Sequence, residues 1–322
     1  MELKPKIYVV TWLYDYQPGM AVYQQRIASL RRNYDVELIS RSSNDRARLN
    51  CEGVTTHVIE NSDSRYFSIP IFCFRVAKFL GRRPSAVTVL LSSQLSMIPL
   101  FSRNMRTCIY WNEMPSHFFY NSKKNPIKSA MHWLLRALTY AGARQSQGVM
   151  AISPFMRDDL LRHGVSSDKT SVIDMGVEDV TPSHADSVRI SPSHLLQLVY
   201  AGTLSSERGK SEMINGVILA LRRGIKLKLS IVGLTESERA EVTKSFQMAG
   251  FEDALTTYGV IPHRDAIEIM GRADFGFTFL RPERHFFFNP PTKLFEYLAN
   301  GIPVICNDIR TLTHYVKGGE TA

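Results

Sequence analysis

The protein has 322 residues, of which 44% are hydrophobic and 21% are charged, as in an ordinary globular protein and unlike a disordered one. No stretch reaches the ~20 apolar residues that a transmembrane helix needs. The most apolar one, residues 69–80, is interrupted by Arg75 and Lys78, and residues 1–6 do not resemble a secretory signal. Four cysteines without a C-x-x-C pair favour a reducing compartment and speak against zinc-ribbon or thioredoxin chemistry. We therefore expect a cytoplasmic protein that neither spans a membrane nor is exported.

Positive charge is concentrated in the first half of the chain. Residues 1–180 carry 23 Lys and Arg against 15 Asp and Glu, whereas residues 181–322 carry 16 against 15. A basic half predicts an anionic partner, which could be a membrane surface, a phosphorylated ligand or a nucleic acid. A solvated, Arg-rich surface without such a partner is an equally good interpretation of the charge alone.

Short β-branched segments alternate with amphipathic ones along the first half. We expect strands at 6–12, 36–40, 85–92, 107–111 and 148–152, and helices at 21–32, 96–101, 128–142 and 154–163. Ser153-Pro154 is typical of a helix start, with serine as the N-cap and proline as the first residue. This alternation predicts an α/β fold with a mostly parallel, doubly wound sheet.

The pattern stops in a polar segment and then restarts. Residues 181–194 contain two prolines and show no periodicity, which is typical of a linker. Beyond it we expect strands at 195–200, 227–232, 256–260, 275–280 and 303–306, and helices at 212–223, 237–249, 263–272 and 291–300. The sequence thus predicts two Rossmann-like domains, 1–180 and 195–322. Because no helix follows the loop at 318–322, we expect the second domain to be incomplete, as in a fragment.

Two loops of the second half carry the residues of a phosphate site. In open α/β sheets, ligands bind beyond the carboxyl ends of the strands and near helix N-termini. The loop AGTLSSERGK places Arg208 and Lys210 at a helix start, where cations are unfavourable unless an anion is present. In FNPPTKLFEY, Lys293 lies in the first helical turn, and an unpaired Glu296 would be costly to bury. A solvated turn and an exposed glutamate are the alternative interpretations.

Two loops of the first half are further candidates. Gly19 lies in a Pro-Gly turn after the first strand, where its backbone can approach a phosphate, although turns use glycine in any case. Asn112 and Glu113 directly follow the strand at 107–111 and could face a ligand. A strand-end turn with a capping asparagine is the alternative.

Taken together, these segments resemble glycosyltransferase family 4, which has the GT-B fold. The resemblance is carried by AGTLSSERGK, by YGVIPHRDAIEIMGRADFGF and above all by PPTKLFEYLANGIPVICND, with GVMAISPFMRDDLLRHGVSSDKTSVIDMGVE closing the first domain. It implies an acceptor-binding and a donor-binding domain that face each other across a cleft. It also implies retention of the anomeric configuration without a metal ion or another cofactor, and no D-x-D triplet occurs in the sequence.

The residues and the resemblance together suggest a role for each candidate. The donor diphosphate would be bound by Gly19, Arg208, Gly209, Thr292 and Lys293, the ribose by Glu296, and the base by Gly233, Tyr258, Gly259 and Val260. The transferred sugar would contact Asn112 and Asn289.

Three positions depart from the family pattern. The first glutamate of its E-x7-E pattern is replaced by Phe288, so Asn289 or main-chain groups of 288–292 would take over its contact. Thr203 stands where the family has its first basic residue. Asn112, with Glu113 beside it, stands where a first-domain histidine is frequent.

The expected reaction moves a sugar from a UDP- or GDP-linked donor to a glycan or lipid-linked acceptor, in cell-surface polysaccharide or glycoconjugate synthesis. Arg208, Lys293 and helix N-termini would stabilise the departing diphosphate. The oxygen of the departing phosphate can take the proton of the acceptor hydroxyl, so the reaction requires little from a protein base. Glu113 is the one catalytic candidate. A non-catalytic GT-B partner protein and a nucleotide-sugar epimerase are the alternatives. A nucleic-acid binder ranks last, because no aromatic residues interleave with the basic ones.

A basic first domain also fits an acceptor carried on an anionic membrane, with the protein bound peripherally to its inner face. The segments expected to make this contact contain Arg75, Lys78, Arg82 and Arg83, or Lys123, Lys124 and Lys128.

Overall fold

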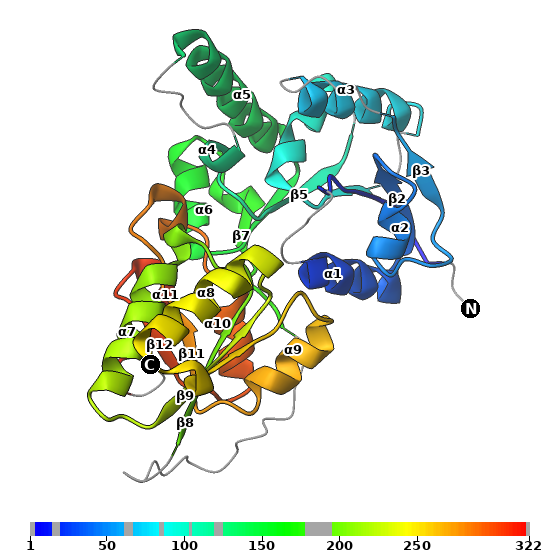
Figure 1. Cartoon of the computed structure of the whole chain (residues 1–322). Coiled ribbons are helices and arrows are strands. Elements are labelled where there is room, and N and C mark those ends of the chain that lie inside the picture. The colour runs from blue at the N-terminus through cyan, green and yellow to red at the C-terminus, as the bar shows by residue number, and fades with distance from the viewer. Residues whose placement is uncertain are drawn as a thin grey trace. The chain divides into compact units, whose positions relative to one another are not determined.

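A computed structural model of the chain describes residues 4–14, 20–60, 67–83, 87–102, 105–118, 125–177 and 195–319. The chain divides into two compact units, Met1–Met175 (unit 1) and Gly176–Ala322 (unit 2), each with a parallel sheet (Figure 1). The α/β fold expected from the alternation of strands and helices is thereby confirmed. The predicted linker at 181–194 lies outside the described residues.

The described part of unit 1 contains a seven-stranded parallel sheet in the order β3-β2-β1-β4-β5-β6-β7. Its strands are β1 (Lys6–Val10), β2 (Asp35–Ser40), β3 (Thr56–Val58), β4 (Val87–Leu90), β5 (Thr107–Trp111), β6 (Gly148–Ala151) and β7 (Thr170–Val172). The order reverses at β1, which pairs with β2 on one side and with β4 on the other. In sheets of this kind, ligands bind beyond the carboxyl ends of the strands next to such a reversal.

The helices of unit 1 connect these strands. They are α1 (Met20–Asn33), α2 (Asp45–Arg48), α3 (Ser68–Leu80), α4 (Pro115–Phe118), α5 (Pro126–Gln145) and α6 (Pro154–Arg162), with 3-10 turns η1 (Ser93–Phe101) and η2 (Ser167–Lys169). The expected cap of α6 is confirmed, because Ser153 Oγ accepts a hydrogen bond from the Met156 N–H. None of the described helices is both long enough and apolar enough to cross a bilayer.

Unit 2 has a five-stranded parallel sheet in its described part, ordered β10-β9-β8-β11-β12. The strands are β8 (Leu196–Ala201), β9 (Leu227–Val232), β10 (Leu255–Thr257), β11 (Phe275–Thr278) and β12 (Val304–Cys306). The helices are α7 (Lys210–Arg222), α8 (Glu236–Ala249), α9 (His263–Met270), α10 (Thr292–Ala299) and α11 (Arg310–Thr313), with 3-10 turns η3 (Ser206–Arg208), η4 (Glu252–Ala254) and η5 (Arg284–Phe287).

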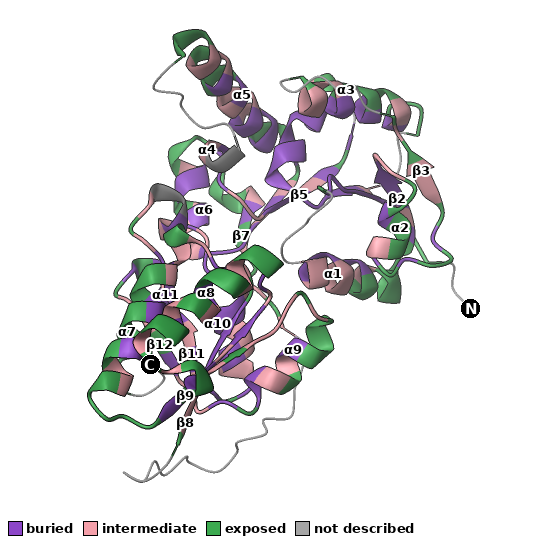
Figure 2. Ribbon diagram, in the orientation of Figure 1, coloured by how far each residue is buried: buried purple, intermediate pink, exposed green. Residues whose placement is uncertain are grey.

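Both faces of the unit 2 sheet are covered, which explains why β8 is apolar at successive positions. Tyr200 packs with Met213 of α7 and Phe246 of α8. Its neighbour Val199 packs on the other face, with residues of α9 and α10 that include Tyr297. Figure 2 shows the same pattern in both units: the strands are largely buried, and the helices are exposed on the faces that point away from the sheet.

The hydroxyl of Tyr297 lies where β8 and β11 separate. The two strands pair only at Phe275–Leu198 and Gly276–Val199. Beyond these pairs, the Tyr297 hydroxyl accepts a hydrogen bond from the Ala201 N–H at 3.1 Å and lies 3.3 Å from the carbonyl oxygen of Val199. A Cβ atom at Gly276 would come within 2.5 Å of the Tyr297 ring, so this position requires glycine. Strand order reverses at β8, and in sheets of this kind ligands bind next to such a reversal.

We expect Tyr297→Phe to lower the free energy of unfolding of unit 2 by about 1–3 kcal/mol, because it leaves a buried N–H without its acceptor. Chemical denaturation followed by circular dichroism measures this change. Tyr34→Phe, at an exposed tyrosine of unit 1, is the control and should be neutral. A Tyr297→Phe variant as stable as the control would contradict the bridging role.

Candidate functional site

Lys293 is a buried cation that forms no ion pair with the described residues. It is the second residue of α10 and only 7% exposed. Its Nζ lies 3.4 Å from the centre of the Tyr200 ring, and a Cβ atom on Gly202 would lie 3.7 Å from it. None of the described residues forms a hydrogen bond or ion pair with this Nζ. Because an isolated ammonium is costly to bury, this arrangement indicates a site for an anion.

The surroundings of Lys293 act on its protonation. Burial lowers the pKa of Lys293 well below its ordinary value, and the nearby Arg208 lowers it further, whereas Glu296 opposes this shift. The two cations that the sequence assigned to a diphosphate are therefore close enough to repel each other. A bound anion would relieve that repulsion and favour the charged lysine.

Glycines bring the backbone close to this cation. Gly202, after β8, has a φ of +105°, and a Cβ atom at Gly233, after β9, would lie 3.3 Å from the Gly202 backbone. Gly209 has a φ of +72°, and a Cβ atom there would come within 2.4 Å of the Phe279 ring. The loops after β8 and β9 therefore approach closely at Gly202 and Gly233, and Gly209 allows the loop after β8 to pack against Phe279.

The N-terminus of α10 adds to the positive potential. The helix begins at Thr292, one residue later than expected, and its N-cap Pro291 offers no side-chain acceptor. Free N–H groups at a helix start favour anions. Thr292 and Asn289 are both half-buried near this end. Phe288, which replaces the first glutamate of the family pattern, is instead buried, with the Arg310 guanidinium 4.7 Å from its ring centre.

Glu296 lies one turn further along α10 and is paired. Its Oε1 is 2.9 Å from Nε2 of His263, the first residue of α9. The Glu296 side chain is 12% exposed and that of His263 is 39% exposed. The sequence predicted a carboxylate here but missed its partner, because the pairing of His263 with Glu296 depends on how α9 and α10 pack.

The residues expected at the base lie on two loops that are joined by backbone hydrogen bonds. Gly233 donates its N–H to the Gly259 carbonyl at 3.1 Å, and the Leu234 N–H donates to the Tyr258 carbonyl at 3.2 Å. Val260 is 72% exposed. The structure thus brings the four predicted base-lining residues together beyond β9 and β10, although their contact with a base stays a prediction.

In unit 1, Asn112 and Glu113 lie among tyrosines at the carboxyl end of β5. Asn112 donates from Nδ2 to the Tyr23 hydroxyl at 2.8 Å, and its Oδ1 accepts the Ser93 N–H at 3.3 Å. Burial raises the pKa of Tyr23 and of Tyr14, and the Glu113 carboxylate raises both further. Asn112 is therefore held by two protein groups, and the Glu113 carboxylate acts on both phenols.

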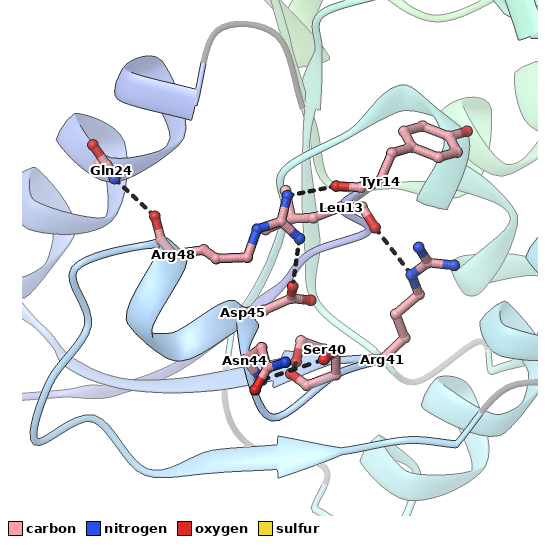
Figure 3. A network of polar contacts seen from close by, with 9 residues as sticks. Leu13, Tyr14, Gln24, Ser40, Arg41, Asn44, Asp45 and Arg48 are labelled. Atoms are coloured by element: carbon pink, nitrogen blue, oxygen red, sulfur yellow. Dashed lines mark hydrogen bonds and ion pairs between the residues drawn. The ribbon is translucent and has the colours of Figure 1, made fainter. Parts of the chain in front are cut away.

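A polar network fixes the start of the loop that carries Gly19 (Figure 3). Arg41 donates from Nε to the Leu13 carbonyl at 2.9 Å, and Arg48 donates to the Tyr14 carbonyl. Arg48 is itself paired with the buried Asp45 at 3.1 Å. These contacts hold the chain just beyond β1, while Gly19 lies outside the described residues.

The sequence model of Glycosyltransferase Family 4 matches residues 19–180, about half of the chain. The chain belongs to glycosyltransferase family 4. No curated protein sequence matches it significantly.

Solved structures show that this family member has the GT-B fold. HepE from Anabaena, solved in complex with UDP and glucose, is 13% identical with a TM-score of 0.70, over 98% of this chain and 84% of HepE. The lipopolysaccharide outer core galactosyltransferase WaaB is 15% identical with a TM-score of 0.65, over 94% and 80%. WaaG, a glycosyltransferase involved in lipopolysaccharide biosynthesis, is 15% identical with a TM-score of 0.64, over 96% and 83%.

We expect Lys293→Met to stabilise the unliganded protein near neutral pH, by on the order of 1–2 kcal/mol, while it abolishes anion binding. The pKa of Lys293 in the folded protein lies below its unfolded value of 10.5. The buried ammonium therefore destabilises the folded protein below pH 10.5, and this destabilisation is absent above pH 10.5. The destabilisation grows as the pH falls from the unfolded pKa to the folded pKa of Lys293, and it is constant below the folded pKa. The gain of the variant in melting temperature should therefore be present at pH 7 and disappear near pH 11.

The control for this measurement is Lys228→Met, at an exposed lysine of β9, which should change stability little at either pH. A Lys293→Met variant that melts below the wild type at pH 7 would show that the ammonium has a stabilising partner.

Proposed function

We propose that the protein is a retaining hexosyltransferase that uses a UDP- or GDP-linked sugar and acts on a glycan or lipid-linked acceptor in cell-surface polysaccharide or glycoconjugate synthesis. The observation that carries the proposal is the buried Lys293 beside Arg208 and Gly202, which forms no ion pair with the described residues. A nucleoside diphosphate supplies the missing negative charge. The complex of HepE with UDP and glucose supports this donor class.

The reaction places new negative charge on the departing diphosphate, and preorganised positive groups stabilise such charge most effectively. In this proposal Arg208, Lys293 and the start of α10 supply the positive groups, and no metal ion is required; that last point stays a prediction. In a front-face transfer with retention, the hydroxyl of the acceptor passes its proton to the oxygen of the departing phosphate. Glu113 in unit 1 is then the residue to test for a supporting role at the acceptor.

Calorimetric titration with UDP, GDP and ADP tests the donor site. We expect one of them to bind, and Arg208→Met to weaken that binding at least tenfold, because an ionised hydrogen bond to phosphate is lost. Arg222→Met, at the exposed far end of α7, is the matched control. Binding of none of the three nucleotides would contradict the proposal. Tight binding without hydrolysis or transfer of any sugar would favour the non-catalytic alternative.

Contact with an anionic membrane is the second part of the proposal, and the charge of one segment supports it. Residues 67–157 contain twelve Lys and Arg but a single acidic residue, Glu113. The excess in this segment is larger than the net charge of +9 of the whole chain. The segment covers α3, η1 and α5, and η1 packs against both helices.

The same segment exposes large apolar side chains on α3, η1 and α5. Phe74 of α3 and Phe101 of η1 form an exposed edge-to-face pair, with ring centres 5.6 Å apart. On α5, Ile127 is 82% exposed and Trp133 is 64% exposed. The C-terminal part of α5 packs on η1 through Gly142, while its other end projects from unit 1 (Figure 1). Lipid accommodates such apolar groups beside basic ones, so the pattern supports a peripheral position on the cytoplasmic face of a membrane.

Vesicle co-sedimentation at low salt tests this contact. Arg75→Glu/Lys78→Glu should reduce binding to vesicles of equal phosphatidylglycerol and phosphatidylcholine at least tenfold, since each basic residue contributes about 1 kcal/mol. The control Lys226→Glu/Lys228→Glu changes the same charge on exposed residues of unit 2. Equal loss in both double variants, or equal binding to pure phosphatidylcholine, would contradict a specific surface.

A further inference from the structure

The carboxylate proposed to bind the ribose is paired with a histidine of another helix. His263 Nε2 lies 2.9 Å from Glu296 Oε1. The two side chains belong to different helices, α9 and α10. The His263 side chain is 39% exposed and that of Glu296 is 12% exposed. The pair therefore lies at the surface of unit 2, where a ligand can reach it.

This pairing leaves Glu296 able to bind a ligand. A carboxylate oxygen has two lone pairs, so Oε1 can accept from the imidazole and from a hydroxyl, and no protein hydrogen bond to Oε2 is present among the described residues. A glutamate loses rotamer freedom when it is fixed by a ligand. In this protein the imidazole of His263 holds the Glu296 side chain before a ligand binds.

The position of His263 also connects two parts of the nucleotide site. Lys293 and Glu296 are three residues apart on α10 and therefore lie on the same side of the helix. His263 begins α9 only three residues after Val260, the end of the base-lining loop. The hydrogen bond between His263 and Glu296 thus joins the start of α9 to α10, the helix that carries Lys293, the cation proposed to bind the diphosphate.

We propose that His263 is a positioning residue for the nucleotide. It holds Glu296 in the orientation that accepts the ribose hydroxyls and so gives the protein its preference for ribonucleotides over nucleotides without these hydroxyls. This inference rests on the proposed function, in which Glu296 binds the ribose of a nucleoside diphosphate.

Calorimetric titration with UDP and with 2′,3′-dideoxy-UDP tests the inference, with GDP and its dideoxy form used if GDP is the nucleotide that binds. His263→Leu should weaken binding of UDP roughly fivefold to twentyfold, as expected for one hydrogen bond to a charged group, and leave binding of dideoxy-UDP unchanged. His263→Gln, whose amide nitrogen can replace Nε2, should restore most of the affinity for UDP. In a Glu296→Gln background, His263→Leu should have no further effect.

His314→Leu, at an exposed histidine of unit 2, is the matched control, and circular dichroism verifies that each variant is folded. An unchanged affinity of His263→Leu for UDP, or an equal loss for UDP and dideoxy-UDP, would overturn the positioning role. In either case the proposed function stands if Glu296→Gln weakens UDP binding. If the wild type binds no nucleoside diphosphate, the proposed function fails and this inference fails with it.

Discussion

A buried ammonium group that forms no ion pair with the described residues is the constraint on which the rest of unit 2 depends. Lys293 lies over the Tyr200 ring, and burial together with Arg208 lowers its pKa. Such a charge is unfavourable for folding, so the remaining structure has to hold it in place. The buried clusters on both faces of the sheet and the closely approaching glycines at 202, 209 and 233 do so.

The fold was predictable from the sequence where segments are long and regular. The strands at 107–111 and 227–232 were predicted with the bounds that the structure has. The sequence did not predict β3, β7 or α2, because three or four residues are too few to show a period. It also missed α3, whose long apolar stretch was considered only as a possible membrane segment.

The site was predictable in composition but not in its contacts. Loop position and residue type pointed to Arg208, Lys293 and Glu296, because phosphate and ribose require cations and a carboxylate at strand ends. The sequence could not show that Lys293 is buried over an aromatic ring, or that His263 pairs with Glu296 across 33 residues of sequence. Such pairings depend on how α9 and α10 pack on the sheet, and no local pattern encodes that packing.

The short pairing between β8 and β11 has a consequence for ligand binding. In the described part of unit 2, these strands are joined by two residue pairs, by hydrogen bonds between Asp274 and Gln197, and by the Tyr297 hydroxyl. Arg208 follows β8, and the base loops follow β9 and β10, whereas Lys293 and Glu296 follow β11. A nucleotide that contacts all of these groups would therefore act as a cross-link over this short pairing. Its binding would suppress local opening there, and the amide hydrogen of Ala201, which donates to the Tyr297 hydroxyl, would exchange with solvent more slowly.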